Sequence, residues 1–222
     1  MKKKITLIVF TVLAICSLNV KAQEVEEKVS PFTVGADIYS NYIWRGTKLG
    51  TGPAFQPSVK FNKGFLTLGV WGSFDASGYT EVDPYISIAL PFGLSIGMTD
   101  YYFPHLGGSF SADSANAYEV NVGFTKGGLS LSANYILNEA TTAASSGKDM
   151  YFQAAYAFTN FNVSVGAGDG WHTSDTEFNV CHVAIGTGKV IKLSDTFSIP
   201  VTGQVIYNPD RDVMYVKSVL HL

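Results

Sequence analysis

The fold class is decided by the stretch Phe32-Thr-Val-Gly-Ala-Asp-Ile-Tyr-Ser-Asn-Tyr-Ile-Trp-Arg45, in which apolar and polar side chains alternate. Only Ser40 and Ile43 interrupt the alternation. A period of two is typical of a β-strand with one apolar and one polar face, and not of a helix. The same alternation predicts further strands over residues 55–62, 66–74, 81–90, 94–102, 118–125, 129–138, 149–158 and 161–168. A weaker alternation predicts three more, over residues 177–192, 196–208 and 212–222. In the first weak strand, the disturbed alternation around Cys181 suggests a β-bulge.

The connections between these strands alternate in length, which is typical of outer-membrane barrels with short periplasmic turns and longer extracellular loops. The sequence therefore predicts an all-β protein, a transmembrane antiparallel up-and-down β-barrel of about twelve strands. The short turns fall at 62–64, 91–93, 126–128, 159–160 and 193–195, and the longer loops at 46–53, 75–79, 104–116, 139–148, 169–176 and 208–211.

The orientation of the two faces separates a soluble sheet from a membrane barrel. In a soluble sandwich or barrel the apolar faces point inward, whereas in an outer-membrane barrel they point to lipid and the polar faces line the lumen. The polar faces contain few lysines and many Gly, Ser, Thr, Asn and Tyr residues, unlike a solvated surface. The apolar faces carry aromatic residues near strand ends, as lipid interfaces require, at Phe32, Trp44, Phe55, Phe61, Phe74, Tyr102, Tyr118, Phe124, Phe158 and Phe161.

The first residues indicate export. Three lysines, Lys2 to Lys4, precede the apolar stretch 5–18, and Ala22 offers a small residue for cleavage, so a signal peptide is predicted. Fourteen apolar residues are fewer than the roughly 20 of a membrane-spanning helix. Lipidation at Cys16 is the other alternative, but Ile15 is not the small residue that such a site prefers. The expected domains are a signal peptide, 1–22, a periplasmic segment, 23–31, and the barrel, 32–222.

Charge and composition limit the partners. Removal of the signal peptide takes away four of 15 basic residues and no acid, which leaves 11 bases against 18 acids and argues against a nucleic-acid partner. Cys181 is then the only cysteine, so no intrachain disulfide can form. The ending Leu220-His221-Leu222 approximates the apolar-x-apolar signal that barrel-assembly machinery reads, although a terminal aromatic is missing. The expected location is the outer membrane of a Gram-negative cell, in contact with its lipid.

The predicted lumen has an excess of acids, which favours cations or neutral solutes over anions. The alternative is that the charges pair across a narrow, closed interior. The aromatic residues could stack sugars or simply fill a small barrel. The expected lining comprises the acids Asp37, Glu81, Asp83, Glu119, Asp149 and Glu177, the bases Lys60, Arg45 near a rim and Lys217, and the aromatics Tyr39, Trp71, Tyr85, Tyr101 and Tyr151.

Enzymatic and metal sites have little support in the sequence. The close pair His172 and Ser174 falls in a predicted loop without a third orienting group, so no catalytic residue is predicted. Asp169, His172 and Asp175 share that loop, but nothing forces them to converge on a metal. We expect no enzyme activity, cofactor or metal.

Four groups of short strings occur in order along the chain: Ser40-Asn41-Tyr42-Ile43-Trp44-Arg45-Gly46 with Pro53-Ala54-Phe55-Gln56-Pro57, Gly69-Val70-Trp71-Gly72-Ser73, Glu81-Val82-Asp83-Pro84-Tyr85, and Tyr101-Tyr102-Phe103-Pro104 with Asn116-Ala117-Tyr118-Glu119-Val120. They resemble the TorF or Gcw-chp family of porins, best over about 33–140. This resemblance implies a small outer-membrane barrel with a pore role. We expect passive diffusion of small hydrophilic solutes, with the long loops gating the outer mouth. The alternatives are a non-conducting structural or surface-binding barrel and, third, an outer-membrane lipid hydrolase.

Overall fold

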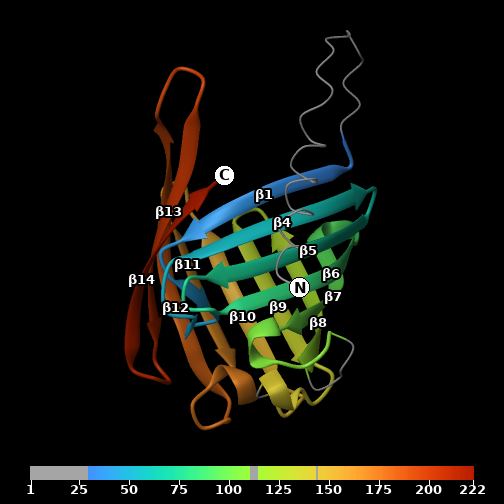
Figure 1. The fold of residues 1–222 in the computed structure, drawn as a ribbon. Helices are drawn as coiled ribbons and strands as arrows, with labels where there is room; N and C mark the ends of the chain where they lie inside the picture. The colour runs from blue at the N-terminus through green and yellow to red at the C-terminus, as the bar shows by residue number, and fades with distance from the viewer. Residues whose placement is uncertain (1–29, 111–114, 144) are drawn as a thin grey trace, which may run out of the picture. The chain divides into compact units, whose positions relative to one another are not determined.

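The computed structural model describes residues 30–110, 115–143 and 145–222, which contain a closed barrel of twelve antiparallel strands (Figure 1). Neighbouring strands follow chain order, and the barrel closes where the first strand pairs with the last, so the predicted up-and-down barrel is confirmed. The predicted signal peptide, 1–22, lies outside the described residues. The barrel strands are β1 (Phe32–Tyr39), β4 (Ala54–Lys63), β5 (Leu66–Asp75), β6 (Thr80–Ala89), β7 (Leu94–Tyr102), β8 (Asn116–Lys126), β9 (Leu129–Ile136), β10 (Met150–Ala157), β11 (Asn162–Gly168), β12 (Asn179–Lys192), β13 (Ser198–Asn208) and β14 (Val213–His221).

The long connections gather at one end of the barrel, the lower end in Figure 1, and the turn between β12 and β13 projects at the other. The long connections also carry the single 3-10 turns η2 (Pro104–Leu106), η4 (Thr141–Ala143) and η5 (Gly170–His172), whereas η1 (Pro91–Gly93) lies in a short turn. In the described part of the chain, no helix combines the length and the apolar character needed to cross a membrane.

The faces of the barrel are inverted relative to a soluble protein. Polar side chains such as Gln56, Glu119 and Asn134 are buried inside, while the apolar faces of the strands point outward. An exposed apolar band around a closed barrel is stable in lipid, because every strand is paired and no edge is left open. The chain is thus an outer-membrane-type β-barrel. The outward residues include Phe55, Val59, Leu68, Val70, Ile86, Ile96, Met98, Val122, Leu131, Phe152, Val165, Val183, Ile185 and Val205.

The predicted bulge in β12 is present. Gly166 of β11 pairs with His182, but the next residue, Ala167, pairs with Val180. Cys181 is therefore the additional residue, and both Cys181 and His182 are buried.

The opening stretch, 32–45, is not one strand, which corrects the prediction. β1 ends at Tyr39, and a separate hairpin of β2 (Tyr42–Trp44) and β3 (Thr47–Leu49) follows. Arg45 and Gly46 form its two-residue turn with φ of 48° and 84°, as a type I′ turn requires. We call residues 42–49 the plug hairpin, because they fold back into the barrel interior.

Candidate functional site

The plug hairpin folds back into the barrel, and its residues contact different parts of the wall. Ile43 packs with Ala184 and Ile206 in one interior cluster. Trp44 packs on the other side, with ring centroids 5.4 Å from those of Tyr101 and Trp171. Trp44 was predicted to lie at the lipid interface, and this is wrong: the chain has left the barrel wall at Ser40, so the strand alternation no longer sets its direction.

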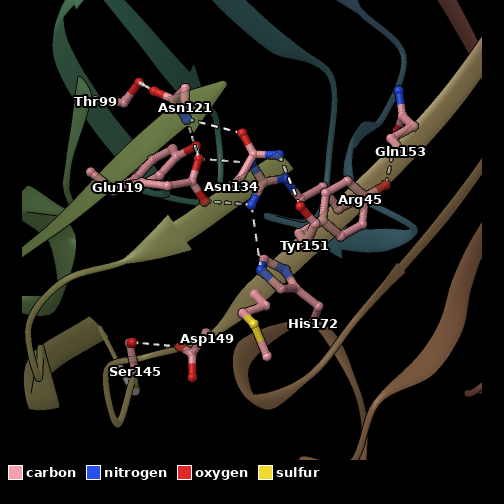
Figure 2. A network of polar contacts seen from close by, with 12 residues as sticks. Arg45, Thr99, Glu119, Asn121, Asn134, Ser145, Asp149, Tyr151, Gln153 and His172 are labelled. Atoms are coloured by element: carbon pink, nitrogen blue, oxygen red, sulfur yellow. Dashed lines mark hydrogen bonds and ion pairs between the residues drawn. The ribbon is translucent and has the colours of Figure 1, made fainter. Parts of the chain in front are cut away.

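Arg45 forms a bidentate ion pair with Glu119 of β8 at the centre of a polar network (Figure 2). Its two terminal nitrogens donate to the two carboxylate oxygens at 2.6 and 2.8 Å. The hydroxyl of Tyr101 and the amide of Asn121 also donate to Glu119, at 3.0 and 2.6 Å. The carboxylate has side-chain exposure of 0%, so this set of donors offsets the cost of burying its charge.

The same guanidinium contacts aromatic rings. It lies 4.6 Å from the centroid of Trp44 and 4.5 Å from that of Tyr151, in cation–π geometry. It also approaches Nε2 of His172, in η5, at 3.4 Å. Burial, and then the charge of Arg45, lowers the pKa of His172 to about 2, so the imidazole is neutral and accepts the hydrogen bond.

Gly46 allows the tip of the plug hairpin to pack closely against Cys181 and Asn208. Its carbonyl accepts a hydrogen bond of 3.0 Å from the side-chain amide of Asn208. A Cβ atom at this position would lie 1.8 Å from the carbonyl oxygen of Cys181, and the backbone has a φ of +84°. Only glycine satisfies both conditions, which explains why a glycine follows Arg45 in the motif.

Two cavities lie beside the plug hairpin. The outer cavity, of about 220 Å³, is lined by Trp44 and Glu81 together with aromatic residues and the exposed η2 residues His105 and Leu106. The inner cavity, of about 300 Å³, is lined by Trp44 and Asp83 together with residues of several strands. Trp44 therefore belongs to both walls. The remaining lining residues are Thr47, Leu49, Tyr79, Phe103, Ala143 and Trp171 outside, and Tyr39, Tyr42, Ile43, Gln56, Trp71, Tyr85, Thr99, Tyr101 and Lys217 inside.

Most of the predicted lining residues are in the interior. Tyr39, Trp71, Tyr85, Tyr101 and Asp83 share the inner cavity, and Glu81 lines the outer one. Tyr151 and Asp149 are buried, and Asp37 contacts His221 at 2.8 Å where β1 meets β14. Arg45 lies in the interior, on the hairpin and not on a barrel strand.

Two other predicted lining residues lie away from the cavities, and for Glu177 the prediction of a strand position is wrong. Glu177 is exposed in the connection that precedes β12, because that strand begins only at Asn179. Lys60 is exposed on β4, close to the short-turn end, and it lines neither cavity. The excess of acids near the plug hairpin therefore depends on Glu81 and Asp83.

The sequence did not point to one interior pair, Ser164 and His182. The hydroxyl of Ser164 lies 2.9 Å from Nε2 of His182. Within the described chain, Nδ1 of His182 has no hydrogen-bond partner, so the orienting group of a catalytic triad is missing. His172 and Ser174, the close pair in the sequence, make different contacts: His172 contacts Arg45, whereas the backbone N–H of Ser174 donates to Asp210. Groups of three or more His, Cys, Asp or Glu side chains able to hold a metal ion are not found in the described ranges.

Several solved outer-membrane barrels are similar to this chain. An active-site mutant of outer membrane phospholipase A from Escherichia coli is 11% identical, with 90% of this chain and 93% of that chain covered at a TM-score of 0.45. BamA from Haemophilus ducreyi lacking POTRA domains 1–3 is 13% identical over 80% of this chain, with a TM-score of 0.41, and a mutant of Rh. blastica porin is 14% identical over 76%, also at 0.41. The chain spans 41% and 55% of these two, less than two thirds of either. No curated protein matches its sequence.

A family model matches residues 25–199, which include the plug hairpin, both cavities' acids and the barrel strands up to the start of β13. Its description is a bacterial protein of unknown function, Gcw_chp. The match covers well over half of the chain. This protein therefore belongs to the Gcw_chp family.

Proposed function

We propose that the protein is an outer-membrane channel for small hydrophilic solutes, closed in this conformation by its plug hairpin. The observation that carries the proposal is the position of Trp44, which lines the outer and the inner cavity at once. Displacement of this one side chain and its hairpin would join the two cavities. The resemblance to the TorF porins supports the same role.

The connection to the wall favours a movable hairpin. β1 and β4 pair directly along their length, up to Tyr39 opposite Ala54, and the hairpin branches off between these two residues. The barrel ladder therefore does not depend on the hairpin. Side-chain contacts and single hydrogen bonds, with one ion pair, hold it inside.

Excision of the hairpin tests the proposal. Replacement of residues 40–53 by Asn-Gly would join Tyr39 and Ala54 by a tight turn that suits such strands. We expect this variant to show larger and more frequent conductance steps in planar bilayers than the native protein. A matched control replaces the turn 193–197, between paired residues Lys192 and Ser198, by Asn-Gly and leaves the lumen unchanged.

The outcomes separate the candidate functions. If neither the native protein nor the excised variant conducts in any salt, the channel is excluded and a non-conducting structural or surface-binding barrel is favoured. If the excised variant conducts, its reversal potential in a salt gradient tests the acidic lumen, since Glu81 and Asp83 predict cation preference. In this proposal the protein is not an enzyme, and outer-membrane lipid and barrel-assembly machinery are its other partners.

A further inference from the structure

Two acidic residues of β6, Glu81 and Asp83, lie in the barrel interior and form no ion pair among the described residues. They occupy successive inward positions and are exposed to only 1% and 5%. The ion pairs found among the described residues are those of Arg45 with Glu119, Lys192 with Asp195 and His221 with Asp37. The guanidinium of Arg45 is thus paired with another carboxylate. Lys217 lines the inner cavity together with Asp83, but it forms no ion pair among the described residues.

The hydrogen bonds of these two carboxylates leave one buried oxygen atom without a partner. Glu81 accepts a hydrogen bond of 2.7 Å from the hydroxyl of Tyr79 and is also hydrogen-bonded to Tyr42 and Asp83. Oδ1 of Asp83 has no hydrogen-bond partner in the part of the chain that the structure describes, although the atom is buried. A buried carboxylate is costly unless a cation or a set of donors meets it, or unless it takes up a proton.

The walls around Glu81 suit one kind of cation. In the outer cavity its neighbours are the rings of Trp44, Tyr79, Phe103 and Trp171. The ring of Trp171 lies 5.4 Å from that of Trp44 and 5.9 Å from that of Phe103, and it meets each of them nearly edge to face. Aromatic faces around a carboxylate attract a quaternary ammonium, which needs negative charge and π-surface but no hydrogen-bond acceptor.

We propose that the outer cavity binds a small quaternary ammonium compound, with Glu81 as its counter-ion and Asp83 as the next carboxylate on the inner side. The volume of about 220 Å³ is below that of pockets for drug-sized ligands, so the ligand is small. His105 and Leu106 are exposed and line the cavity, so it can be reached from the end that carries the long loops. The ligand of this site would be the solute class of the proposed channel, so this inference rests on the proposed function.

Tryptophan fluorescence of the refolded full chain in detergent measures the binding directly. Three tryptophans are present, and all line a cavity: Trp44 both, Trp171 the outer and Trp71 the inner. Choline and its uncharged isostere 3,3-dimethyl-1-butanol are titrated in parallel. We expect saturable quenching by choline and at least about tenfold weaker binding of the alcohol. Equal binding of both compounds, or no saturable response to choline, overturns the proposal.

Variants locate the site. Glu81→Gln removes the charge with little change of shape, and we expect it to weaken choline binding about tenfold. Glu177→Gln makes the same change at an exposed loop position and should bind as the native protein does. Trp171→Leu keeps both carboxylates and should weaken choline binding about threefold to tenfold. Heat-modifiable gel migration shows that each variant has folded. Unchanged affinity in folded Glu81→Gln or Trp171→Leu contradicts the site.

The binding experiment needs no membrane, so its failure is distinct from that of the channel. Conductance of the hairpin-excised variant without choline binding to the native protein would leave the channel and remove this site. Choline binding without conductance in any variant would leave the site and remove the channel.

Discussion

Arg45 and Glu119 carry opposite charges into the interior, where neither is in free contact with water. The side chain of Arg45 is 12% exposed and that of Glu119 is 0% exposed. Because guanidinium and carboxylate match in shape, both hydrogen bonds form together, and a lysine could supply only a single point charge. Loss of one partner leaves the other buried without compensation.

A double-mutant cycle measures this dependence. Arg45→Met and Glu119→Gln should each lower the free energy of unfolding by about 3–5 kcal/mol, and the double variant should lose much less than the sum. Urea unfolding of refolded protein in detergent, followed by tryptophan fluorescence, gives the values. Lys48→Met removes an exposed cation from the same hairpin and should change little. Additive single effects would show that the two residues do not act as a pair.

His172 should make the stability sensitive to mild acid. Its pKa is lowered from 6.5 to about 2 in the folded protein, so below pH 6.5 the unfolded chain binds a proton that the folded chain does not. The stabilising contribution is therefore complete above pH 6.5 and is lost as the pH falls towards 2. At pH 5 the loss amounts to about 2 kcal/mol.

The measurement compares urea midpoints at pH 7.5 and pH 5 for the native protein and for His172→Gln. The variant removes this titration and retains all others, so its stability should fall less between the two pH values. An equal fall in both proteins would mean that His172 does not titrate differently on unfolding.

At the scale of elements, the tip of the plug hairpin depends on a glycine. Gly46→Ala would place a methyl group against the carbonyl of Cys181 at a positive φ, so the hairpin tip should lose its contact with Cys181 and Asn208. We expect larger conductance or, at least, a lower urea midpoint. Gly52→Ala is the matched control in the same connection, since an added Cβ there meets no atom within 4 Å. Similar conductance and urea midpoints of the two variants would contradict the close packing of Gly46 against Cys181.

The strands could be predicted because their signal is local. Each strand carries its own alternation, and even the bulge at Cys181 was visible as a disturbance of that period. The plug hairpin could not be predicted in the same way. Tyr42 and Trp44 continue the alternation of β1, and only the interruptions at Ser40 and Ile43 hinted that the strand had ended. Whether a short hairpin then points into the lumen depends on Glu119 and Ala184, which lie far along the chain.

The cavities illustrate the same limit. Strand register placed Glu81 and Asp83 on the inner face, and the structure finds both buried there. Register could not show that Arg45 would pair with Glu119 and not with either of these two acids. His172 lies in a predicted loop, and its contact with Arg45 arises only because η5 folds against the hairpin. The sequence alone could not show this contact.

At the scale of the whole molecule, closure depends on the short pairing of β1 with β14. Asp37, Ile38 and Tyr39 pair with their partners, and backbone hydrogen bonds of Ala36 with Leu222 and of Ser40 with Ser218 flank them. A disulfide tests this closure. Ile38→Cys with Leu220→Cys places two cysteines opposite each other on the outer face, and they should cross-link on oxidation. The oxidised barrel should be more stable by roughly 2–4 kcal/mol.

Non-reducing gels show whether this cross-link forms. Ile38→Cys with Val216→Cys is the control, because Val216 is four residues along the strand, on the order of 13 Å away. Cross-linking of the control pair as fast as the designed pair would contradict the register of the closure.

The attachment of the plug hairpin at one end of the barrel has an electrical consequence. The hairpin carries the charge of Arg45 and leaves the wall at the end with the long connections. A voltage positive at that end drives the guanidinium towards Glu119, and the opposite voltage draws it out. A full unit charge crossing 100 mV is worth about 2.3 kcal/mol, so even part of that distance shifts the balance. In the proposed channel we therefore expect rectification, with current passing more readily at the voltage that draws Arg45 away from Glu119.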